Sequence, residues 1–261
     1  MPIMKLNGET FHVKVDGPKA APALVLSNSL SSNLSMWDGQ IPEWSKAFRV
    51  VRYDTRGHGQ SVTSAPPYSL AQLAGDALAL MDALGIARAN WCGLSMGGMV
   101  GQWLATHHPQ RLNRVVLANT ASRMGPPDLW NARIRTVSAS GMEAIVDATL
   151  DRWLSKAFQE RDKKATAAVR KMILGTSPQG YCGSGAAIRD MDQREAIRSI
   201  ALPVLVVTGS MDPATPPAAG QFIQAQIKGA KLVELQAAHV SNIEQPEAFG
   251  KAVLEFLTAG K

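Results

Sequence analysis

Short apolar runs alternate along this chain with segments of helical periodicity, and this alternation restricts the possible folds more than any other feature. Most of the runs are rich in Val and Leu and lack a polar face, as strands buried on both sides do. We expect strands at residues 11–15, 23–27, 48–53, 90–92, 113–118, 203–208 and 231–235. Strands that alternate with helices form a mostly parallel sheet with right-handed crossovers. The chain is therefore predicted to be an α/β protein with a doubly wound sheet.

Helices are expected between these strands. Residues 70–84 carry Leu or Ala at helical spacing, with Ser69 placed to cap the start of the helix and Gly85 placed to end it. Further helices are expected at residues 96–108, from residue 216 onward and at residues 246–257.

The alternation stops between residues 123 and 198. This stretch carries three helical apolar stripes and no convincing buried strand. We therefore expect a core domain formed by residues 1–122 and 199–261, and an inserted helical cap, or lid, at 123–198. The insertion contains 13 Lys/Arg and 9 Asp/Glu, which is +4 of the chain's net +6. This excess fits a lid over an anionic substrate and fits an ordinary solvated surface equally well.

Composition excludes several other classes of protein. The 261 residues are 46% hydrophobic and 18% charged, which excludes a disordered chain. No apolar run reaches the roughly 18 residues that a membrane helix needs. The first ten residues lack the apolar core of a secretion signal, so a cytoplasmic location is expected. Without a run of basic residues, no nucleic-acid partner is expected, and two cysteines, Cys92 and Cys182, form no metal-ligand cluster.

The residues Gly93-Leu94-Ser95-Met96-Gly97 match the pattern G-x-S-x-G. The match follows an expected strand and opens an expected helix, which is the context of a nucleophile elbow. In such a turn the serine backbone is strained and the flanking glycines avoid collisions with the neighbouring elements. Ser95 is therefore the candidate nucleophile. The backbone amide of Met96, directly after it, is a candidate donor to a developing oxyanion.

A serine hydroxyl needs a base to take its proton. In hydrolases with such an elbow the order along the chain is serine, acid, histidine. His239 lies just beyond the last expected strand and is the candidate base. The other histidines, which we expect to be structural, all precede the elbow or follow it closely: His12, His58, His107 and His108.

The acid that orients the histidine is expected to be Asp212. It follows the strand at 203–208, at the carboxyl edge where open α/β sheets place their sites. The stretch after the preceding strand reads LANT, so Asn119 stands there and no carboxylate does. Asp54 is the second candidate, although it precedes the serine in the sequence.

With these residues the chain resembles the α/β-hydrolases over its whole length. A narrower resemblance is to the 3-oxoadipate enol-lactonases of the β-ketoadipate pathway of aromatic compound catabolism. It rests on the stretches SNSLSSNLSMWD (27–38), RYDTRGHG (52–59), CGLSMGGMVGQW (92–103), WNARI (130–134), TSPQGYCGSGAAIRD (176–190) and AAHVSNIEQPEAF (237–249). The stretches within the insertion are the more specific ones, because lids diverge fastest.

This resemblance implies hydrolysis of 3-oxoadipate enol-lactone, a small anionic lactone, with no cofactor and no metal. Relatives usually read His-Gly-X in the loop after the strand at 23–27, where this chain reads Asn28-Ser29-Leu30. Counting back from Trp37 makes the amide of Leu30 the second oxyanion donor, or that of Ser29 if the offset is one residue.

The substrate carries a free carboxylate, and burying it requires a partner, for which arginine offers a bidentate one. Arg133 is the first candidate, with Trp130 as an apolar wall of the pocket, and Arg189 is the second.

Two other functions remain compatible with the sequence. A broad carboxylesterase or a cofactor-free perhydrolase would use the same three catalytic residues. A ligand receptor that has lost its chemistry would keep the fold alone. A dehalogenase is disfavoured because its nucleophile is an aspartate and position 95 is serine. The sequence carries no signal for the oligomeric state.

Overall fold

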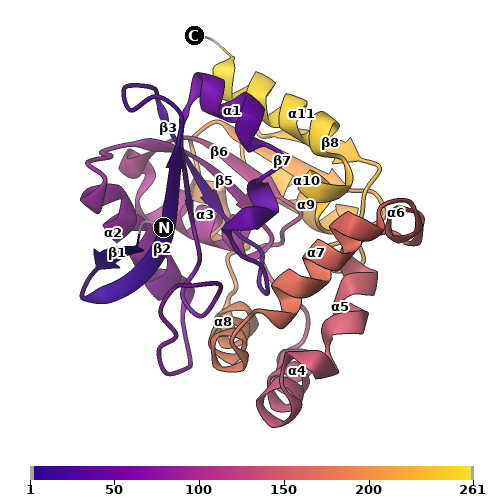
Figure 1. Cartoon of the computed structure of the whole chain (residues 1–261). Helices are drawn as coiled ribbons and strands as arrows, with labels where there is room; N and C mark the ends of the chain where they lie inside the picture. Colours follow the sequence, from indigo (N-terminus) through magenta and orange to yellow (C-terminus); the bar gives the residue numbers. More distant parts are fainter. Residues whose placement is uncertain (1–2, 260–261) are drawn as a thin grey trace.

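The computed structural model describes residues 3–259, and a single eight-stranded sheet runs through this part of the chain (Figure 1). The order of the strands in the sheet is β1-β2-β4-β3-β5-β6-β7-β8. The strands are β1 (Ile3–Leu6), β2 (Glu9–Asp16), β3 (Ala23–Ser27), β4 (Arg49–Tyr53), β5 (Ala89–Leu94), β6 (Leu112–Ala118), β7 (Val204–Gly209) and β8 (Lys231–Leu235). The outermost positions of the expected core domain, residues 1–2 and 260–261, lie outside the described residues.

The sheet is mostly parallel, as the sequence predicted. β1 pairs with β2 and β2 with β4 in antiparallel fashion, and all the remaining pairs are parallel. Every residue of β3, β5 and β7 is buried, which explains why these strands read as continuous apolar runs.

Helices cover both faces of the sheet (Figure 1). On one face lie α1 (Ile41–Ala47) and α11 (Pro246–Thr258), whose Trp44 and Phe249 rings are 6.2 Å apart. The other face carries α2 (Leu70–Ala83), α3 (Met96–His107) and α9 (Pro217–Gln226). The fold class predicted from the sequence, an α/β-hydrolase fold with a doubly wound sheet, is thereby confirmed.

The helix α2 begins and ends where its sequence signals predict. The Ser69 hydroxyl accepts a hydrogen bond from the Gln72 amide at 3.1 Å, and Gly85 has a φ of +66°. β1 and α1 were not predicted from the sequence, because both are short and neither shows a full apolar stripe.

Between β6 and β7 the chain forms a group of helices at one end of the sheet (Figure 1). They are α4 (Pro127–Ser140), α5 (Val146–Trp153), α6 (Lys156–Arg161), α7 (Lys163–Leu174) and α8 (Pro178–Asp190). Their buried residues, Trp130 and Trp153 among them, are continuous with the core around the sheet. The division into a core domain and a lid domain stays a prediction.

Shorter helices complete the described chain. They are the single turns η1 (Leu34–Trp37), η2 (Pro109–Arg111), η3 (Met142–Ala144) and η4 (Ala196–Ser199), and the short α10 (Ser241–Glu244). Within residues 3–259, none of the helices is long and apolar enough to span a membrane.

Candidate active site

Ser95 lies in a sharp turn between the end of β5 and the start of α3. Its φ is +56°, in the left-handed region that a residue with a side chain rarely adopts. Two hydrogen bonds hold this backbone: the Ser95 amide donates to the Ala118 carbonyl at 2.8 Å, and the Thr120 hydroxyl donates to the Ser95 carbonyl at 2.7 Å. The strained turn predicted from G-x-S-x-G is therefore present, and both of its hydrogen-bonding partners lie at or just after the end of β6.

The glycines around Ser95 are required by close backbone approach. A Cβ on Gly93 would lie 2.0 Å from the Gly97 carbonyl oxygen, and a Cβ on Gly97 would lie 2.1 Å from the Ser27 carbonyl oxygen. These neighbours are backbone atoms, so they cannot rotate away as a side chain could. Position 97 thus sets how closely α3 approaches β3.

His239 and Asp212 meet at the carboxyl edge of the sheet, after β8 and β7. The His239 Nδ1 and the Asp212 Oδ2 are 2.8 Å apart, and both side chains are buried. An Nδ1–H that donates to the carboxylate leaves Nε2 as the basic nitrogen, which is the arrangement of an oriented general base.

The Asp212 carboxylate is itself held by several donors. Its Oδ1 accepts from the amides of Ala214 at 2.8 Å and Thr215 at 3.0 Å, and its Oδ2 accepts from the Thr215 hydroxyl at 2.6 Å. Burial opposes ionisation of this group, but the His239 ring and the hydrogen bonds from His239 and Thr215 outweigh it. The pKa of Asp212 is accordingly lowered, and the group is a carboxylate at neutral pH.

Asn119 is a further residue of this arrangement, for which no role was predicted from the sequence. Its side-chain amide donates to Asp212 Oδ2 at 3.0 Å and to the Ala238 carbonyl at 3.2 Å. Its carbonyl oxygen accepts from the Ser241 hydroxyl at 2.5 Å. Asn119 therefore links the acid to the loop that carries His239. The one sequence signal for this role is the position of Asn119 directly after β6, at the sheet edge that also carries Asp212 and His239.

Ser95 and His239 line one cavity of about 240 Å³. Within the described chain their side chains are not hydrogen-bonded to each other. Trp130 and Arg133 line the same cavity, with the Arg133 guanidinium 5.1 Å from the centre of the Trp130 ring. Other lining residues had no signal in the sequence, among them Thr149, Arg152, Trp153 and Tyr181 of the helical segment.

The loop after β3 brings candidate oxyanion donors to this cavity. In the part of the chain that the structure describes, the amides of Leu30 and Met96 donate to no protein acceptor, and the same holds for Ser29. The choice between Leu30 and Ser29 stays a prediction. Asn28 fixes the loop, because its carbonyl accepts from the Gly97 amide at 3.0 Å and its side-chain oxygen accepts from the Trp37 indole at 2.9 Å.

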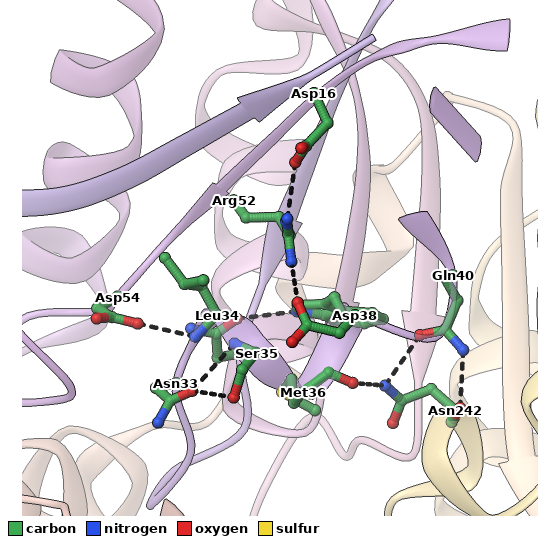
Figure 2. A network of polar contacts seen from close by, with 12 residues as sticks. Asp16, Asn33, Leu34, Ser35, Met36, Asp38, Gln40, Arg52, Asp54 and Asn242 are labelled. Atoms are coloured by element: carbon green, nitrogen blue, oxygen red, sulfur yellow. Dashed lines mark hydrogen bonds and ion pairs between the residues drawn. The ribbon is translucent and has the colours of Figure 1, made fainter. Parts of the chain in front are cut away.

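The rest of this loop is anchored by a polar network (Figure 2). The Arg52 guanidinium binds Asp38 at 2.5 Å and Asp16 at 2.7 Å, and Asn242 donates to the Met36 carbonyl at 2.7 Å (Figure 2). The Asp54 carboxylate accepts from the Leu34 amide at 2.8 Å. The donor loop is thus tied to β4, to β2 and to α10.

The residues that were second candidates for the site, or were expected to be structural, have partners outside the cavity or beside it. Besides Leu34, the Asp54 carboxylate binds His12 Nδ1 at 2.8 Å. Burial lowers the pKa of His58, and its neutral ring accepts from the Ser31 amide at 3.0 Å, which makes it a support of the donor loop. The Arg189 guanidinium forms an ion pair with the Asp190 carboxylate, with Nε and Oδ1 2.7 Å apart, and Arg189 does not line the cavity.

Residues 3–259 contain no cluster of three or more His, Cys, Asp or Glu side chains that could hold a metal ion. Both cysteines are buried and free.

A strained serine at a strand-to-helix turn, with a His–Asp pair at the same edge of a mostly parallel sheet, defines a hydrolase of the α/β class. The alpha/beta hydrolase fold family matches residues 22–246, and the chain belongs to this family.

The chain is also similar to 3-oxoadipate enol-lactonases. It is 42% identical to 3-oxoadipate enol-lactonase 2 of Acinetobacter baylyi over 95% of this chain and 91% of that protein. It is 38% identical to 3-oxoadipate enol-lactonase 1 of the same organism, over 95% and 92%. The crystal structure of the enol-lactonase from Burkholderia xenovorans is 46% identical, with a TM-score of 0.97 over 98% of this chain and all of that one. The resemblance expected from the sequence is confirmed.

The close approach at Gly97 leads to a first prediction. Gly97→Ala places a methyl group against the Ser27 backbone, so α3 must shift away from β3 and the Ser95 turn must change. We expect a loss of about 3 kcal/mol in the free energy of unfolding in urea, together with loss of hydrolysis.

Gly75→Ala is the matched control, because Gly75 lies inside α2 with open space at its Cβ. It should stabilise the protein by roughly 0.5–1 kcal/mol and leave hydrolysis unchanged. Wild-type stability and activity in Gly97→Ala would contradict the proposed role of this contact.

Proposed function

We propose that this protein hydrolyses 3-oxoadipate enol-lactone to 3-oxoadipate, with Ser95, His239 and Asp212 as the catalytic residues. One observation supports the proposal above all others: Ser95 and His239 line one cavity, with Asp212 held against the histidine, in a chain similar to enol-lactonases along its length.

In the first half of the proposed reaction, the Ser95 oxygen attacks the lactone carbonyl while His239 Nε2 takes the hydroxyl proton. The carbonyl electron pair moves to oxygen, and the amides of Leu30 and Met96 stabilise that oxyanion. When the carbonyl re-forms, the ring C–O bond breaks, and the leaving enolate takes the proton from the His239 imidazolium, so that His239 is again a neutral base. An enolate is a better leaving group than an alkoxide, and it stays attached because the ester is cyclic.

In the second half, His239 takes a proton from water, and the resulting hydroxide attacks the acyl-serine. Collapse of the second tetrahedral intermediate returns the proton to Ser95 and releases one product with a new carboxylate. Asp212 stays ionised throughout and stabilises the imidazolium, for which its lowered pKa equips it. No cofactor takes part in this sequence.

We further propose that the helical segment, residues 123–198, is the lid of this site. The Trp153 ring lies 6.0 Å from the His239 ring, and the Val240 amide donates to the Trp153 carbonyl at 3.2 Å. The buried Glu244 carboxylate accepts from the Ser155 hydroxyl in the lid and from the Ala238 amide in the histidine loop. A lid with these contacts both encloses the substrate and supports the base. The cytoplasmic location stays a prediction.

The first test of this function compares substrates. We expect kcat/KM on the enol-lactone to exceed that on p-nitrophenyl acetate and that for peracid formation. A preference for the simple ester would instead favour a broad carboxylesterase or a perhydrolase.

In the same assays Ser95→Ala should lower kcat by about a thousandfold or more. Unchanged hydrolysis in that variant would leave a receptor as the better interpretation.

The second test addresses the substrate carboxylate, for which we propose Arg133 as a partner and Trp130 as an apolar wall. Arg133→Ala should raise KM on the anionic lactone by roughly tenfold or more, because it removes a charged hydrogen-bonding partner, and should spare a neutral ester. Arg135→Ala is the control, since Arg135 lies exposed on the same helix. Equal losses on both substrates would mean that Arg133 has a structural role.

A further inference from the structure

A second arginine lines the cavity, and neither the motifs nor the resemblance pointed to it. Arg152 comes from α5, whereas Arg133 comes from α4, and both line the cavity that holds Ser95 and His239. The Arg152 side chain is partly buried and donates to the Thr149 hydroxyl at 3.2 Å. Two helices of the inserted segment thus each contribute one positive charge to the same small space.

The two guanidinium groups are close enough to influence each other. Burial lowers the pKa of Arg152, and the positive charge of Arg133 lowers it further. The buried Tyr181 lies near both arginines. Burial raises the pKa of its hydroxyl, while the charges of Arg133 and Arg152 act in the opposite direction. The cluster formed by Arg133, Arg152 and Tyr181 is therefore a positively charged patch in the wall of the cavity.

Within residues 3–259 no carboxylate forms an ion pair with Arg133 or Arg152. Asp151, the nearest in sequence, binds Lys156 Nζ at 2.5 Å instead. Several other arginines of the inserted segment do have such partners, among them Arg170 with Asp147, Arg189 with Asp190 and Arg194 with Asp192. Like charges kept together and partly out of water without a counter-ion are unfavourable. An anion in the cavity would relieve that cost.

We propose that Arg152 binds the substrate carboxylate together with Arg133, so that the cavity selects acyl compounds carrying a negative charge away from the scissile bond. This inference rests on the proposed function for the identity of the substrate. Ser95, Arg133 and Arg152 line one cavity of about 240 Å³, so a small ligand with its carbonyl at Ser95 can reach the arginines with its carboxylate. Two guanidinium groups can together satisfy most of the lone pairs of one carboxylate.

The cluster can be tested without the lactone. Adipate has the carbon chain and the two carboxylates of the expected product, and adipamide is its neutral counterpart. We would measure the Kd of both by calorimetry for the wild type, Arg152→Gln, Arg152→Lys and Arg161→Gln. Arg161 is the control because it is exposed in α6 and does not line the cavity.

We expect adipate to bind the wild type and Arg161→Gln equally, and to bind Arg152→Gln about tenfold to hundredfold more weakly, the range for losing a hydrogen bond to a charged group. The Kd of adipate for Arg152→Lys should lie between these values, because lysine keeps the positive charge but lacks the planar guanidinium group. Adipamide should bind all four proteins equally weakly. If Arg152→Gln does not fold, the affinities of Arg152→Lys for adipate and adipamide are compared with those of the wild type instead.

The proposal is overturned if adipate does not bind the wild type, if its Kd is the same in the Arg152 variants, or if adipamide binding changes in parallel. Kinetics on the lactone then separate this inference from the function itself. Arg152→Gln should raise KM with little change in kcat. A wild type that binds adipate through Arg152 but does not open the lactone would overturn the function and leave the anion site standing.

Discussion

The whole site depends on how the backbone of one residue, Ser95, is held in a conformation that it would not adopt alone. The end of β6 and the loop that follows it hold Ser95 from one side, through the Ala118 carbonyl and the Thr120 hydroxyl. From the other side, the Gly97 amide donates to the Asn28 carbonyl, which lies in the loop that follows β3. The same contacts that keep the serine strained therefore also place the candidate oxyanion donors beside it. A strained backbone conformation of this kind persists only where several contacts with the surrounding structure hold it in place.

The histidine side of the site depends on the inserted helices as much as on the sheet. Trp153 packs near the His239 ring, and the buried Glu244 joins the start of α6 to the loop that precedes His239. A carboxylate buried in this way is tolerated because hydroxyl and amide donors replace its hydration. The position of His239 is consequently coupled to the helical segment that lines the cavity, so the candidate base and the cavity wall share structural supports.

Several features could be predicted from the sequence because each is specified by a few neighbouring residues. The elbow needs small residues at Gly93 and Gly97, the start of α2 needs a capping side chain at Ser69, and fully buried strands need continuous apolar runs. The positions of Asp212 and His239 followed from the rule that parallel strands end at one edge of the sheet. The spacing from Asn28 to Trp37 also reflects a contact, since the Trp37 indole donates to the Asn28 side chain.

By itself, then, the sequence determined the sheet apart from the edge strand β1, the turn that holds the serine, and which side chains follow which strands. Only the tertiary structure decided what the inserted helices bring to the cavity. Arg152 and Tyr181 are far apart in the chain, and no motif connects them with Arg133. The supporting role of Asn119 was hidden for the same reason, and so was the particular contact, with the Ser31 amide, of His58, which was expected to be structural. Local patterns report the conformation of the backbone, whereas a charge without a partner is visible only once all neighbours in space are known.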